Sequence, residues 1–96
     1  MYEKILYEMR ARVRRGRLII TVHGRQEMFN DGLLASDVKN CLLKGRIVER
    51  QWDEDFAEFK YLVEGPSNDV EDFIHVAAKL GTEDTVVITV YRVWQL

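Results

Sequence analysis

Val86-Val87-Ile88-Thr89-Val90-Tyr91-Arg92-Val93-Trp94 is the most apolar stretch of the chain, and it decides the fold. Strict alternation divides it into one face with Val86, Ile88, Val90, Arg92 and Trp94, and another with Val87, Thr89, Tyr91 and Val93. Because both faces are largely apolar, we expect this strand to lie in the middle of a sheet.

Three preceding stretches also alternate and predict strands over residues 46–52, 58–64 and 73–80. In the first, Val48 and Trp52 fall on one side, and Ile47 and Glu49 on the other. The third places Ile74, Val76, Ala78 and Leu80 on one face. Gly65-Pro66-Ser67-Asn68-Asp69 reads as a loop, since proline suits the start of a turn. A meander of four antiparallel strands follows from this order.

The first half of the chain reads as helical. Ile5, Leu6, Met9 and Val13 form one apolar stripe of a helix over residues 2–15, which Gly16 ends. A short strand over residues 18–22 and a helix over residues 23–30 follow. A further helix has Ser36 as its expected N-cap, carries Val38, Cys41 and Leu42 on one face, and ends at Gly45. We therefore predict an α+β fold in which N-terminal helices pack on a small, mainly antiparallel twisted sheet.

The 96 residues, 47% of them hydrophobic, suit a single domain over residues 1–96. The lone Cys41 excludes a disulfide framework within the chain, and its place on the apolar helix face predicts packing rather than reactivity. No apolar run is long enough to span a membrane, and Met1-Tyr2-Glu3-Lys4 lacks the layout of a signal peptide. We expect a cytoplasmic protein.

The net charge of −2 hides an asymmetry. Residues 1–25 hold seven basic and two acidic side chains, a net +5, whereas residues 49–72 hold two basic and nine acidic ones, a net −7. The basic end could hold a polyanion that the acidic end repels, or both could be solvated surfaces of opposite sign. The basic side chains that could contact an RNA backbone are Arg10, Arg14, Arg15, Arg17, Arg46, Arg50 and Lys60.

Three positions could carry chemistry. His23 and Glu27 lie four residues apart on a helix, so the carboxylate can orient the imidazole for general acid–base catalysis. Alternatively, His23 caps the helix and Glu27 is an exposed surface residue. His75 lies in an apolar strand, where it is either a half-buried core residue or a second acid–base group. Tyr91 and Arg92 could bind a phosphate, or serve packing and solvation.

Much of the chain resembles domain-of-unknown-function family 4258. The resemblance covers residues 18–92 and rests on an ordered set of short matches: Thr21-Val22-His23, Glu27-Met28, Asp31-Gly32, Asp37-Val38, Gly45-Arg46-Ile47-Val48-Glu49, Val63-Glu64-Gly65, Ile74-His75-Val76 and Val87-Ile88-Thr89-Val90-Tyr91. That family looks related to RelE-like and MqsR-like toxins of bacterial toxin–antitoxin pairs. The resemblance implies a RelE-like fold, cleavage of free or ribosome-bound mRNA, and a cognate antitoxin that often carries a small zinc-binding domain.

Three functional hypotheses follow. The first is a type II toxin, an endoribonuclease (mRNA interferase) without cofactor or metal, in which His23 and His75 exchange the proton, Glu27 orients His23, and Tyr91 and Arg92 bind the scissile phosphate. The second is a RelE-like module that docks a partner protein without catalysis. The third is a metal site of His23, Glu27 and His75, which we rank last.

Overall fold

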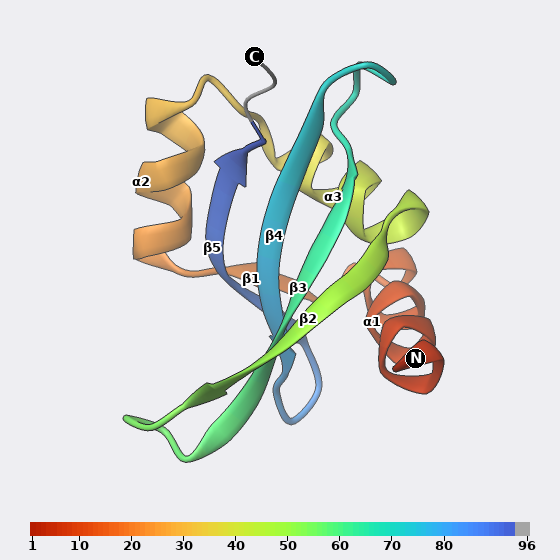
Figure 1. Cartoon of the computed structure of the whole chain (residues 1–96), viewed down its shortest axis with the longest axis vertical. Coiled ribbons are helices and arrows are strands. Elements are labelled where there is room, and N and C mark those ends of the chain that lie inside the picture. Colours follow the sequence, from red (N-terminus) through yellow and green to blue (C-terminus); the bar gives the residue numbers. More distant parts are fainter. Residues whose placement is uncertain (94–96) are drawn as a thin grey trace.

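The apolar strand near the C-terminus lies inside a five-stranded sheet (Figure 1). The computed structural model describes residues 1–93, so Trp94 of the predicted strand lies outside the described residues. The strand is β5 (Thr85–Arg92), and the sheet order is β1-β5-β4-β3-β2. The other strands are β1 (Leu18–Ile20), β2 (Arg46–Asp53), β3 (Glu58–Pro66) and β4 (Phe73–Leu80).

The sheet is mixed but mainly antiparallel. The pairs β2–β3, β3–β4 and β4–β5 form the predicted antiparallel meander. The short strand β1 pairs with β5 in parallel, over Thr85 to Val87 only. Beyond that point the edge of β5 faces a helix instead of a strand.

Three helices complete the predicted α+β fold: α1 (Glu3–Arg14), α2 (Val22–Asn30) and α3 (Ala35–Lys44). The helices α1 and α3 cover one face of the sheet, and α2 runs alongside β5 (Figure 1). None of the helices within residues 1–93 is long and apolar enough to cross a membrane.

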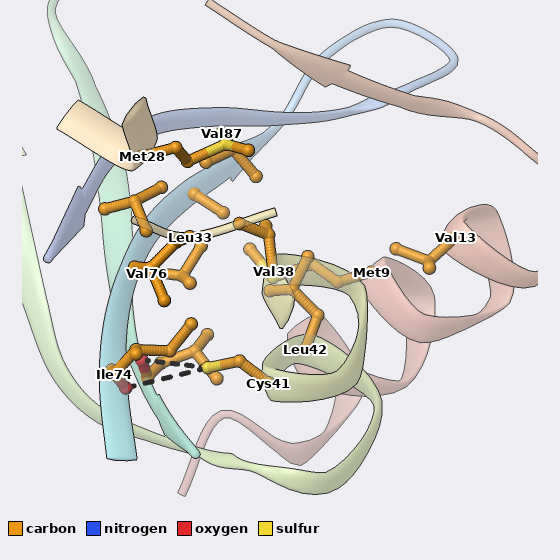
Figure 2. Close-up of a cluster of buried hydrophobic side chains, with 13 residues drawn as sticks. Met9, Val13, Met28, Leu33, Val38, Cys41, Leu42, Ile74, Val76 and Val87 are labelled. Atoms are coloured by element: carbon orange, nitrogen blue, oxygen red, sulfur yellow. Dashed lines mark hydrogen bonds between the residues drawn. The ribbon is translucent and has the colours of Figure 1, made fainter. Parts of the chain in front are cut away.

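The core lies between the covered face of the sheet and the two helices (Figure 2). It unites Met9 and Val13 of α1, Val38, Cys41 and Leu42 of α3, and Val63, Ile74, Val76, Val87 and Val90 of the sheet. The Cys41 thiol is fully buried and lies 3.7 Å from the carbonyl oxygens of Val63 and Ile74. Burial raises the pKa of this thiol to about 12, with a smaller effect of Glu64, so Cys41 packs as predicted.

Two β-bulges overturn the predicted strand faces. In β5 the pairing with β4 skips Ile88, so Val87 and Val90 both point into the core, although strict alternation separates them. In β2 the pairing skips Val48, so Ile47 packs against the core and Glu49 turns to the other face. A bulge adds one residue to one strand, and an alternation pattern in a single sequence does not reveal where that happens.

Some predicted element ends were also wrong. The strand predicted over residues 18–22 ends at Ile20, because the Thr21 hydroxyl accepts a hydrogen bond from the Gly24 N–H (3.1 Å) and caps α2. Ser36 is not an N-cap: α3 begins at Ala35, and the Asp37 carboxylate accepts the Leu34 N–H at 2.7 Å.

Two glycines allow the backbone after α3 to cross β3 at close range. Gly65 and Pro66, predicted as loop, are the end of β3. A Cβ on Gly65 would lie 2.7 Å from the Gly45 Cα and 2.8 Å from the Cys41 carbonyl oxygen, and a Cβ on Gly45 would lie 2.6 Å from that same oxygen. These neighbours are backbone atoms, which cannot rotate away. The crossing fixes where β2 enters the sheet.

We expect Gly65→Ala to lower the free energy of unfolding by about 2–3 kcal/mol, because the added methyl group forces two backbone segments apart. Urea denaturation measures the effect. Gly32→Asn is the matched control: Gly32 has a φ of +67°, a Cβ at this position would meet no atom within 4 Å, and asparagine tolerates that conformation. An equal loss in both variants would contradict the close crossing as the cause.

Candidate active site

One row of side chains crosses the open face of the sheet, away from α1 and α3. Register places Arg46 opposite Glu64, Glu64 opposite His75, and His75 opposite Tyr91. Their sequence neighbours Val63, Ile74, Val76 and Val90 point into the core, so this row points the other way. Four strands thus contribute one polar side chain each to a single line.

Three members of this row form a hydrogen-bonded chain. The His75 Nε2 lies 2.8 Å from a Glu64 carboxylate oxygen, and its Nδ1 lies 3.0 Å from the Tyr91 hydroxyl. The rings of His75 and Tyr91 meet edge to face, with centroids 5.2 Å apart. The His75 side chain is only 17% exposed, so the protein holds this imidazole in place.

The partners define the proton positions in the neutral imidazole. An ionised carboxylate only accepts hydrogen bonds, so Nε2–H donates to Glu64. Nδ1 then carries the free lone pair and accepts from the Tyr91 hydroxyl. The result is a carboxylate–imidazole–hydroxyl relay, the arrangement in which a carboxylate orients a base that receives a hydroxyl proton.

Tyr91 keeps its proton at neutral pH. Burial raises the pKa of this phenol, and the nearby Glu49 and Glu27 carboxylates raise it further. A phenol with a raised pKa stays protonated up to a higher pH, so the hydroxyl remains a donor to the His75 Nδ1. Tyr91 is 38% exposed, so the relay reaches the protein surface at this residue.

The bulge at Ile88 is what turns Tyr91 toward the relay. Val87 points into the core, and without the extra residue Tyr91 would point the same way. The backbone around the bulge contacts the start of α2: the Thr21 N–H donates to the Val87 oxygen at 2.9 Å, and a Cβ on Gly24 would lie 3.3 Å from the carbonyl oxygens of Val87 and Ile88.

The predicted pair His23 and Glu27 forms on α2, with 3.2 Å between Nε2 and the carboxylate oxygen. The same Glu27 oxygen also accepts the Val90 backbone N–H at 3.2 Å. One turn later, Asp31 accepts the Arg92 N–H at 3.1 Å. The two carboxylates therefore take the place of a neighbouring strand where β1 has ended, a role that the sequence reasoning missed.

The two histidines occupy separate settings. His23 is 65% exposed and bonds to Glu27, whereas His75 bonds to Glu64 and Tyr91. Within residues 1–93 no hydrogen bond or ion pair joins the two imidazoles. The exchange of a proton between His23 and His75 stays a prediction. Of the two imidazoles, that of His75 is the more firmly oriented, because both of its ring nitrogens have a hydrogen-bond partner.

Arg92 is engaged inside the molecule. Its Nε donates to the Asp31 carbonyl oxygen at 3.1 Å, and its Nη1 forms an ion pair with Asp72. The guanidinium thus ties the end of α2 to the segment that precedes β4. Its predicted contact with a scissile phosphate would require this ion pair to open.

The predicted RNA-binding residues fall into three groups. Arg10 donates to the carbonyl oxygens of Leu42 and Gly45 at the end of α3, and Arg50 stacks on Phe59 with 4.0 Å to the ring centroid. Arg15 and Arg17 lie 3.6 and 3.7 Å from Glu8 and Glu83, and Arg14 is exposed. Arg46 and Lys60 belong to the open face: Arg46 lies opposite Glu64 of the relay, and Lys60 lies four residues before Glu64 on the same strand.

The relay also includes a residue that the sequence reasoning did not single out, Glu64. Two features of the sequence could have indicated it. Glu64 directly follows Val63 near the end of a predicted strand, so alternation places its side chain on the face opposite the core, and the next strand carries His75.

Within residues 1–93 no group of three or more histidine, cysteine, aspartate or glutamate side chains is arranged to hold a metal ion.

Fold and site together define an α+β domain whose open sheet face carries a carboxylate–imidazole–hydroxyl relay. The family described as Domain of unknown function (DUF4258) matches residues 20–92, and the chain belongs to it. Neither the comparison with curated proteins nor that with solved structures found a match.

We expect Glu27→Ala to lower the free energy of unfolding by about 1–3 kcal/mol, because it leaves the Val90 N–H without its acceptor. Thermal and urea denaturation measure the loss. Gln26→Ala, at an exposed position on the same helix, is the control and should change stability by less than about 0.5 kcal/mol. Equal stability of both variants would show that α2 does not hold the edge of β5.

Proposed function

We propose that this protein is the toxin of a bacterial type II toxin–antitoxin module, an endoribonuclease with a RelE-like fold that cleaves mRNA by general acid–base catalysis without a metal. The observation that carries the proposal is the Glu64–His75–Tyr91 relay on the open face of the sheet. The family resemblance supplies the biological setting, and the relay supplies a chemistry that suits it.

The relay fits the first half of RNA cleavage. A 2′-hydroxyl gives its proton to the Tyr91 oxygen while the phenol proton moves to the His75 Nδ1, so the tyrosine stays neutral throughout. The 2′-oxygen attacks the phosphorus, and the bond from phosphorus to the 5′-oxygen breaks. Glu64 stabilises the imidazolium that forms. The products are a 2′,3′-cyclic phosphate and a 5′-hydroxyl group.

The leaving 5′-oxygen needs a proton, and the phosphate needs positive charge. His23 is the predicted second acid–base group, and its exposed ring is accessible to a substrate. Arg46 lies in the same row as the relay, on the neighbouring strand to Glu64, where its charge stabilises the extra negative charge of the transition state.

His75→Ala should lower the rate of cleavage of a mixed RNA substrate by about 10²–10⁴-fold, since it removes the base. Tyr91→Phe and Glu64→Gln, which keep the shape of their side chains, should each lower the rate at unchanged thermal stability. Addition of a chelator should leave the rate of the wild-type protein unchanged.

His23→Ala is the informative partner variant. A loss comparable to that of His75→Ala supports His23 as the acid, and an unchanged rate assigns that proton to water. Cleavage that survives His75→Ala and His23→Ala together overturns the acid–base mechanism, and the absence of RNA cleavage by the wild-type protein overturns the enzymatic proposal.

A second candidate function, docking of a partner protein, is favoured by the aromatic end of the β2–β3 hairpin. This hairpin extends beyond the helices (Figure 1). Its end carries Trp52, Phe56 and Phe59, which are 51%, 71% and 39% exposed, and Trp52 and Phe59 meet edge to face at 4.9 Å. Clustered exposed aromatic side chains mark protein interfaces. The partner that we propose is the cognate antitoxin.

Trp52→Ala combined with Phe56→Ala should weaken binding of the protein encoded next to this chain by about 2 kcal/mol or more, as removal of interface anchors does. Isothermal titration of the purified pair measures it. Tyr7→Ala, at a 72% exposed aromatic residue of α1, is the control. Equal affinities for both variants would rule out the hairpin end as the docking surface.

A further inference from the structure

A hollow of about 280 Å³ lies on the sheet next to the relay. Glu64 belongs to both the hollow and the relay. The other walls are Lys44, Gly45, Arg46, Gly65, Pro66 and Phe73. Two of these walls, Gly45 and Gly65, are the glycines at the close crossing of the backbone before β2 with β3. Its size is at the lower limit of pockets that hold small ligands.

The chemistry of the walls matches one unit of a nucleic acid strand. Phe73 and Pro66 pair in register across β3 and β4 and offer an aromatic ring beside an apolar one, and Phe73 is 37% exposed. Lys44 and Arg46 are exposed cations at the rim. Glu64 is the one acidic wall, and one of its oxygens is bound by the His75 Nε2 at 2.8 Å.

The spacing along β4 connects the hollow to the relay. Phe73 precedes His75 by two residues and points to the same face, so the two side chains stand about 6.6 Å apart along the strand. A base stacked on Phe73 therefore brings the adjoining phosphate toward His75 and Tyr91, with the cationic rim beside it.

We infer that this hollow binds the base of the nucleotide next to the cleaved phosphate, stacked on Phe73, while Arg46 contacts the cleaved phosphate and Lys44 the backbone phosphate that follows. The inference rests on the proposed function and specifies its substrate as single-stranded RNA, because a base that is paired and stacked in a duplex has no free face for the ring.

Binding without cleavage separates this inference from the proposed catalysis. The probe is a fluorescein-labelled 2′-deoxy tetranucleotide of mixed sequence, which lacks the attacking hydroxyl and is not cleaved. Fluorescence anisotropy gives its dissociation constant. Phe73→Leu keeps the apolar bulk but removes the aromatic face, and it should weaken binding about tenfold. Phe73→Trp should restore wild-type affinity.

The rim and the matched control complete the test. Arg46→Ala should reduce the slope of log affinity against log salt by about 0.7, the value for one phosphate contact on a single strand. Phe56→Leu, at the more exposed aromatic residue of the hairpin end, should leave the affinity for the probe unchanged.

Each outcome decides one claim. Equal affinities of the wild type and Phe73→Leu, or equal binding of the single-stranded probe and of a DNA hairpin that holds the same four nucleotides in its stem, overturn the base-binding hollow. Binding that depends on Phe73 with no cleavage of RNA supports the hollow and overturns the catalytic proposal. Cleavage of RNA at the same rate and the same sites in the wild type and Phe73→Leu overturns the hollow while the relay stands.

Discussion

The bulge at Ile88 is the constraint on which the open face depends. It lets Val87 and Val90 enter the core from the same strand, and it sends Tyr91 to the opposite face, where it meets His75. Residues of α2 contact the backbone on both sides of the bulge: Gly24 packs against it, and Glu27 accepts the Val90 N–H. A short edge strand that ends at Ile20 leaves the space for that helix. The motif residues before and within α2 thus have a structural purpose, which is to hold β5 in the register that builds the relay.

Local chemistry predicted the elements of this fold well, because each helix and strand carries its own periodicity. The stripe from Ile5 to Val13 and the alternation from Ile74 to Leu80 each have one apolar face, and both faces reach the core or its edge. The parallel pairing of β1 and the two bulges were not predictable in the same way. They depend on which backbone groups meet across the sheet, and that information lies in no single segment.

The same distinction explains the partial prediction of the site. His75 and Tyr91 stood out because their residue types carry proton chemistry, but their contact is a matter of register, 16 residues apart in sequence. Glu64 was one of nine acidic residues between positions 49 and 72, and although it lies in the Val63-Glu64-Gly65 match, its contact with His75 depends on the pairing of β3 with β4. Conversely, two arginines predicted to contact RNA are engaged within the protein: Arg10 donates to the carbonyl oxygens of Leu42 and Gly45 at the end of α3, and Arg50 stacks on Phe59. The net charge of a segment therefore overstates the number of charged side chains that are available to bind a partner.

The buried thiol of Cys41 has a practical consequence. It is the only cysteine of the sequence, it is fully buried at the junction of α3 with β3 and β4, and its pKa of about 12 keeps it protonated. A thiol-specific reagent can attack it only when the helix lifts off the sheet. The rate at which a thiol reagent labels the native chain therefore reports how often the core opens around Cys41. It allows the opening of the core to be compared between variants without an added probe.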